Sequence, residues 1–273
     1  MRTKTLLLAA AALAVSLVSS QAQVYSGVVG YYNVTIPAHS FALLGNQLIN
    51  GSDVTQTNND INTVVSSGLV SDPNGPPSGT NSAYYQWTGS SYNTYYYFNV
   101  NDGAAYGVNG STAGWYDQAG NPASVSLNQG LSAFLRNPSG SSMTVTLVGS
   151  VLQGTNKIAI PSGFSLLSLP QPISTNADVS AIGLPDSLLS SDPNGPPSGT
   201  NDIYYQWTGS SYNSFYYFNI ADGAAYGVNG STAGFYDQAG NPLPPSSYPQ
   251  VGQGFILKHF GSAITWTNSF IPQ

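Results

Sequence analysis

The feature that most constrains this sequence is an internal duplication. Residues 71–122 and 191–242 are nearly the same segment written twice, 120 positions apart, and they differ at only seven of 52 positions. A repeat of this length indicates two copies of one folding unit, not a stack of short repeats. We therefore expect a functional surface to be presented twice, and chemistry that needs a residue from one copy alone carries little weight.

Weaker similarity extends the duplication beyond these two blocks. Downstream of them, residues 130–136 correspond to residues 252–258, with a glycine, an aromatic residue and a final basic residue in both copies. The sequence therefore predicts a first β unit over residues 23–152 and a second over residues 153–273. Both units keep the same turn residues, which predicts matching strands in matching order.

The N-terminal segment has the pattern of a secretory signal peptide. Arg2 and Lys4 precede an apolar stretch over residues 6–18, and a small-x-small cleavage pattern follows at residues 20–22. The apolar stretch is short for a membrane span. We therefore predict a signal peptide over residues 1–22, no membrane span after its removal, and a secreted or cell-surface location, with the periplasm as the alternative.

Charge and cysteine content exclude several classes of function. The chain has no cysteine, and only 6% of its residues are charged, against about a quarter in a typical protein. Beyond the signal segment three basic residues, Arg136, Lys157 and Lys258, stand against eleven acids, all of them aspartate. Binding to nucleic acid is excluded because three scattered cations cannot neutralise a phosphate backbone. Such low charge favours self-association or adsorption to neutral polymers.

Short β signals dominate the repeated block. Residues 84–87 and 92–98 are aromatic runs separated by a Thr-Gly-Ser-Ser turn, and this pattern predicts a β-hairpin in each copy. Asp60, like Asp178, is placed to cap a short helix. We predict an all-β fold with minor short helices: two homologous antiparallel units, each a sandwich or open barrel, packed with pseudo-twofold symmetry.

The order of several motifs resembles that of uncharacterised exported two-repeat proteins from environmental bacteria of the verrucomicrobial and planctomycete type. The motifs lie at residues 28–34, 164–167, 204–209, 234–237 and 252–255. The resemblance spans nearly the whole chain after the signal segment. It implies export and a β-rich fold, and it implies no particular activity.

Few residues are suited to catalysis. His39 and His259 do not occupy equivalent positions in the duplication, and no Gly-x-Ser-x-Gly motif accompanies them. Asp102 and Asp117, repeated as Asp222 and Asp237, are candidates for the acid and base of a polysaccharide hydrolase. Both lie in turn sequences in which aspartate caps its own backbone, so we predict a structural role and no enzyme activity.

The same aspartates, with two neighbouring asparagines, offer hard oxygen ligands that would suit calcium. No Asp-x-Asp-x-Asp array accompanies them, and we expect no other cofactor. The candidate ligands are Asp72, Asn74, Asp102, Asp117, Asp192, Asn194, Asp222 and Asp237.

The aromatic residues give the most specific binding hypothesis. Strand alternation places Tyr95, Tyr97 and Asn99 on one face of the 92–98 strand. We predict that this face is the exposed one, because burying an amide without a partner costs about 1–3 kcal/mol. Trp87 and Phe98 are expected in the core. The candidate binding residues are Tyr95, Tyr97, Asn99, Trp115 and Tyr116 with their counterparts Phe215, Tyr217, Asn219, Phe235 and Tyr236.

These observations support three hypotheses. The first is a secreted, non-enzymatic structural or adhesive protein whose partner is itself or an extracellular polysaccharide. The second is a carbohydrate-binding protein that stacks sugar rings on the duplicated tyrosine-rich face. The third is a polysaccharide hydrolase that uses the aspartate pairs.

Overall fold

The computed structural model describes most of the chain after its N-terminal segment. The predicted signal peptide and the helix start predicted at Asp178 lie outside the described residues. The described ranges are 29–51, 59–65, 67–110, 112–172, 184–230 and 232–270.

The first unit is a two-layer β structure. A five-stranded antiparallel sheet has the order β2-β6-β3-β4-β5, and a two-stranded ribbon, β1-β7, packs against it. The elements are β1 (Val29–Ile36), β2 (Phe41–Gly45), α2 (Ile61–Val64), β3 (Ala83–Trp87), β4 (Tyr92–Phe98), α3 (Val100–Tyr106), β5 (Gly114–Tyr116), β6 (Ser132–Arg136) and β7 (Met143–Ser150).

The second unit repeats this arrangement strand for strand. Its five-stranded sheet has the order β9-β13-β10-β11-β12, and its ribbon is β8-β14. The elements are β8 (Gly154–Ile160), β9 (Gly163–Ser168), η2 (Asp186–Leu188), β10 (Ile203–Trp207), β11 (Tyr212–Phe218), α4 (Ile220–Tyr226), β12 (Gly234–Tyr236), η3 (Pro245–Ser247), β13 (Gly254–His259) and β14 (Ile264–Phe270). The predicted all-β fold with two homologous units and short helices is confirmed.

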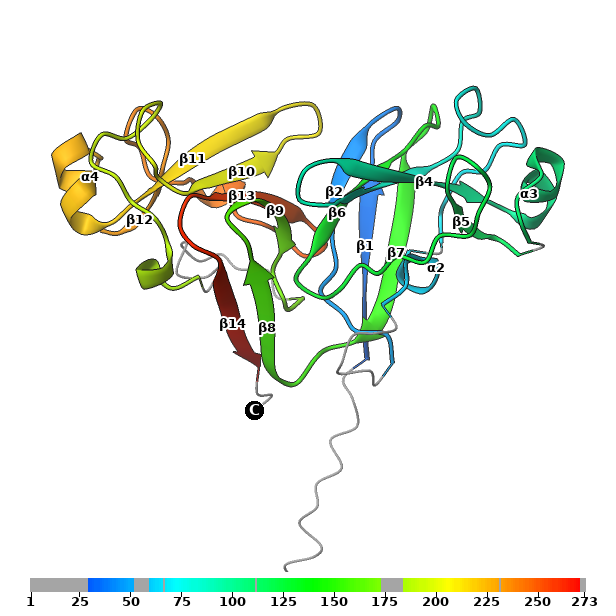
Figure 1. Cartoon of the computed structure of the whole chain (residues 1–273), viewed down its shortest axis with the longest axis horizontal. Coiled ribbons are helices and arrows are strands. Elements are labelled where there is room, and N and C mark those ends of the chain that lie inside the picture. The colour runs from blue at the N-terminus through cyan, green and yellow to red at the C-terminus, as the bar shows by residue number, and fades with distance from the viewer. Residues whose placement is uncertain are drawn as a thin grey trace, which may run out of the picture.

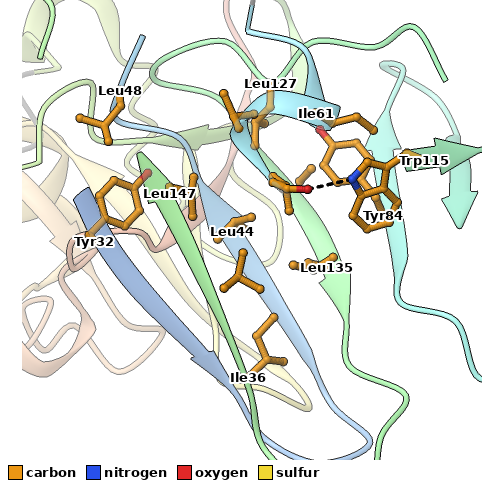
Figure 2. Packing of buried hydrophobic residues seen from close by; sticks show 14 of the residues in the cluster. Tyr32, Ile36, Leu44, Leu48, Ile61, Tyr84, Trp115, Leu127, Leu135 and Leu147 are labelled. Carbon is orange, nitrogen blue, oxygen red and sulfur yellow. Dashed lines mark hydrogen bonds between the residues drawn. The ribbon is translucent and has the colours of Figure 1, made fainter. Parts of the chain in front are cut away.

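The core of each unit lies between its sheet and its ribbon. In the first unit Leu44 and Leu135 of the sheet lie near Ile36 and Leu147 of the ribbon, while Tyr84 lies beside Ile61 and Trp115, and all of these residues are buried (Figure 2). This follows from alternation, since residues two apart on a strand share a face. The inner face of the sheet is therefore the one that carries Tyr84.

One helix in each unit was missed from the sequence. The Asp102-Gly103 pair has the composition of a turn but lies inside α3, a helix that begins after Asn99. The Asn99 side chain caps this helix: it accepts a hydrogen bond from the Asp102 backbone amide and donates one to the Asp102 carboxylate. Asn219 and Asp222 repeat this cap at α4. The cap that Asp60 was predicted to make is present at α2.

The two units pack side by side through reciprocal contacts. Helices α3 and α4 lie at opposite ends of the molecule, while the β3–β4 and β10–β11 hairpins both point toward its middle (Figure 1). The indole of Trp87 donates to the Phe164 carbonyl at 2.9 Å, and that of Trp207 donates to the Phe41 carbonyl at 3.0 Å. Each unit thus extends one tryptophan over the edge strand of the other, in agreement with the predicted pseudo-twofold packing.

Candidate functional site

The outer faces of the two five-stranded sheets carry an unusual set of aromatic side chains. Register pairs Trp87 with Tyr92, and Tyr85 with Phe134, so these four residues share the face opposite Tyr84. In the second unit Tyr205, Trp207 and Tyr212 occupy the same positions. The outer faces meet where the units pack, around a small cluster of Leu43, Phe134, Leu166 and Ile256.

This meeting point is hollowed into what we call the aromatic groove. Two adjoining cavities of about 240 and 350 Å³ lie on either side of Tyr92 and Tyr212, which line both. Tyr92 and Tyr212 remain 42% and 43% exposed, so the groove is open to solvent. Its lining consists of Phe41, Tyr85, Trp87, Tyr92, Phe134, Phe164, Leu166, Tyr205, Trp207, Tyr212 and Ile256.

Ring contacts hold the groove in shape. The Trp87 and Tyr92 ring centroids lie 4.9 Å apart, and those of Trp207 and Tyr212 lie 4.8 Å apart. Trp207 also meets Phe134 of the other unit edge-on at 5.4 Å. Because each indole is fixed by its hydrogen bond to the partner unit, the walls of the groove are preformed, a property that lowers the entropic cost of binding.

Three tyrosines of the groove, Tyr92, Tyr205 and Tyr212, have raised pKa values. Burial, followed by the nearby Tyr92 phenol, raises the pKa of Tyr212 to about 12. Burial likewise raises the pKa of Tyr92 and of Tyr205. These hydroxyls therefore stay protonated and can donate hydrogen bonds to a ligand.

The prediction that the face of Tyr95, Tyr97 and Asn99 is the exposed one is wrong. Tyr95 and Tyr97 are half-buried against the first core, and Asn99 and Asn219 are occupied in capping helices. The argument from the Asn99 amide fails because both polar atoms of that side chain are hydrogen-bonded to Asp102. The other predicted binding residues are all buried, with at most 6% exposure: Trp115, Tyr116, Phe215, Tyr217, Phe235 and Tyr236.

The expectation for Trp87 is wrong as well, whereas that for Phe98 is confirmed. Trp87 lines the groove, while Phe98 is completely buried. The signal that could have identified the groove was present in the alternation, which separates Tyr85 and Trp87 from Tyr84. The positions of Phe41 and Phe164 beside it depend on how the two units pack.

Several of the candidate metal ligands stabilise turns through hydrogen bonds to nearby backbone and side-chain groups. The Asp72 carboxylate accepts hydrogen bonds from the backbone and side chain of both Asn74 and Thr80. These bonds, with the Thr80 amide first, lower the pKa of Asp72 to about 2. Asp192 repeats the arrangement with Asn194.

The remaining candidate aspartates also form hydrogen bonds with residues close to them in the sequence. Asp117 accepts from the amides of Ala119 and Asn121, and Asp237 does the same in the second unit. Asp102 and Asp222 belong to the helix caps. Within the described residues no three histidine or acidic side chains gather closely enough to hold a metal ion. The hydrogen bonds give these aspartates roles in turns and helix caps, and the calcium site and the hydrolase pair stay predictions.

Comparisons with known proteins add no further information. No family model matches the sequence, and searches of curated proteins and of solved structures find no match. The resemblance to exported repeat proteins therefore stays a prediction. Among the described residues, no helix combines the length and apolar character needed to span a bilayer.

Proposed function

We propose that this protein is an exported, non-enzymatic adhesion protein that binds extracellular glycan chains in the aromatic groove. The observation that carries the proposal is the pairing of two equivalent aromatic cavities across the pseudo-twofold axis. A ligand that fits such a site presents the same chemistry repeatedly along its length, as a polysaccharide does.

The chemistry of the groove suits sugar rings. The C–H faces of pyranose rings stack on aromatic faces, while neutral tyrosine hydroxyls bond to sugar hydroxyls. The larger cavity, at about 350 Å³, falls within the range of sites that hold small ligands. The N-terminal secretory pattern supports a location where such polymers occur.

Replacing Tyr92 and Tyr212 together by alanine is the direct test. We expect glycan affinity to fall about 30-fold or more, in keeping with loss of central aromatic contacts worth about 2 kcal/mol or more. The melting temperature should change little because both rings are more than 40% exposed. Affinity gel electrophoresis against a panel of neutral and acidic polysaccharides measures the binding.

Tyr31→Ala is the matched control for this test. Tyr31 lies on β1, away from the groove, and is 72% exposed. The control should bind glycan as the unmodified protein does. Unchanged binding by the Tyr92→Ala, Tyr212→Ala variant would refute the proposal.

A second candidate function, self-assembly, is supported by one surface feature. The ribbon of the first unit exposes an apolar patch in which Val29, Tyr31 and Val148 are 72%, 72% and 58% accessible. Tyr31 and Val148 are direct cross-strand partners. Exposed apolar groups on a short ribbon are typical of contacts between protein copies.

If assembly uses this ribbon, Tyr31→Asp with Val148→Asp will abolish it, because two charges would be buried in the contact. Negative-stain microscopy and sedimentation at rising concentration are the measurements. If the unmodified protein remains monomeric at all concentrations, this second function is ruled out.

A further inference from the structure

We propose that the glycan bound by the aromatic groove is anionic, carrying carboxylate or sulfate groups, and that Arg136 and Lys258 recognise those groups. The inference rests on the proposed function and specifies its ligand class. It begins from the placement of the few cations in the chain. Beyond residues 1–28, which the structure does not describe, the sequence has only three lysines and arginines.

Two of these three cations occupy equivalent positions beside the groove. Lys258 on β13 lies directly opposite Phe164 on β9, and its ammonium nitrogen is 5.4 Å from the centre of the Phe164 ring. Phe164 lines the larger cavity and is 41% exposed. The ammonium group is therefore positioned at the wall of the groove.

Arg136 occupies the same place in the first unit. On β6 it lies directly opposite Phe41, which lines the smaller cavity, and it follows Phe134 by two positions on the same face. Its side chain is exposed. Each half of the groove is thus bordered by one cation, although the surrounding sequence carries a formal net charge of −6.

No carboxylate of the described residues neutralises either cation. The one salt bridge found in those ranges joins His259 to Asp202, and the Lys258 ammonium lies over the faces of Phe164 and Phe260. The aspartates described above are engaged in turns and helix caps. Two unpaired cations at matching positions provide charge complementarity for an anionic chain, and aromatic faces between them receive its sugar rings.

The test compares acidic with neutral glycans on the intact protein. We expect polygalacturonate, alginate or chondroitin sulfate to bind about tenfold more tightly than hydroxyethylcellulose at about 20 mM sodium chloride. Most of this preference should disappear at about 300 mM salt, where exposed charges are screened. Comparison of the carboxylated with the sulfated polymers identifies which anion is preferred.

Variants then assign the preference to the two cations. Arg136→Gln and Lys258→Gln should each weaken acidic binding about threefold, and together they should remove the preference for acidic glycans. Arg136→Lys and Lys258→Arg should retain it. The control is Lys157→Gln, which removes the third cation from an exposed position on β8 and should leave binding unchanged.

Each outcome separates the two proposals. If neutral and acidic glycans bind equally, or if Lys157→Gln weakens acidic binding as much as the paired variant does, the anionic ligand is wrong. The proposal that the groove binds glycan would still hold if Tyr92→Ala with Tyr212→Ala abolishes binding. If that tyrosine variant binds normally, both proposals fail.

Discussion

Replacing His259 by asparagine should destabilise the second unit by about 3–5 kcal/mol, because it removes one of the three hydrogen-bond partners of the buried Asp202 carboxylate and leaves the amides of Ser190 and Phe260. Asp202 and His259 are 0% and 2% exposed, and His259 Nδ1 lies 2.7 Å from Asp202 Oδ2. The second ring nitrogen faces the Ser262 carbonyl at 2.7 Å. Both ring nitrogens therefore face oxygen atoms, one of the Asp202 carboxylate and the other of the Ser262 carbonyl.

The first unit supplies the matched control for this experiment. There Ser82 replaces Asp202, and Asn137 replaces His259. Ser82 accepts the Val70 amide, and the Asn137 amide group donates to the carbonyls of Ile36 and Pro37. The second unit therefore uses a carboxylate and an imidazole at positions where the first unit uses a hydroxyl and an amide.

Adding Asp202→Ser to His259→Asn should recover most of the lost stability, since no buried charge then remains. Conversely, Ser82→Asp alone should destabilise the first unit. Urea unfolding of the four variants of the Asp202–His259 cycle measures the coupling free energy. Additive costs would show that the two residues do not act as a pair.

The contact between Asp202 and His259 could not be predicted from the sequence, although both positions differ between the two units. Ser82 and Asp202 form one of the seven differences in the duplicated block, while His259 and Asn137 differ outside it. The changes are 57 residues apart in the second unit, so spacing alone gives no reason to join them. They are linked because β10 and β13 are neighbours in the sheet, which brings Asp202 against His259.

The fold was readable from the sequence because its signals are local. Hairpin turns, alternating aromatic runs and retained glycines specify each strand in both copies. Alternation also separates the two faces of β3 and β4 correctly. It cannot tell which face is inner, because both carry aromatic rings. That choice depends on the ribbon, whose strands lie at the ends of the unit sequence and cover the Tyr84 face.

The groove could not be predicted in the same way, because it belongs to the contact between the two units. Phe41 and Trp207 are 166 residues apart, and their hydrogen bond forms only when the units pack. The duplication indicated a pseudo-twofold axis but not which surfaces lie along it. The tryptophans that resemble core residues in the sequence therefore proved to be the walls of a solvent-open site.

The two faces of one strand lead to opposite expected results. Tyr97→Ala with Tyr217→Ala should greatly lower the free energy of unfolding, since deletion of a buried aromatic side chain costs about 3–5 kcal/mol. Tyr217 is 1% exposed and meets Phe235 edge-on at 5.6 Å, while Tyr97 meets Trp115 at 5.7 Å. Urea and thermal unfolding provide the measurement.

The control for this pair lies on the same strands. Tyr92 and Tyr212 lie on β4 and β11 with their rings on the opposite face, so their replacement should affect binding and leave stability nearly unchanged. A Tyr97→Ala, Tyr217→Ala variant with normal stability and lost glycan binding would reverse this assignment. Such a result would place the glycan-binding surface on the face of the sheet that carries Tyr97 and Tyr217 and packs against the ribbon. The expected contrast follows from geometry, because alternation along β4 and β11 places Tyr97 and Tyr217 on the inner face and Tyr92 and Tyr212 on the opposite face, where they line the groove.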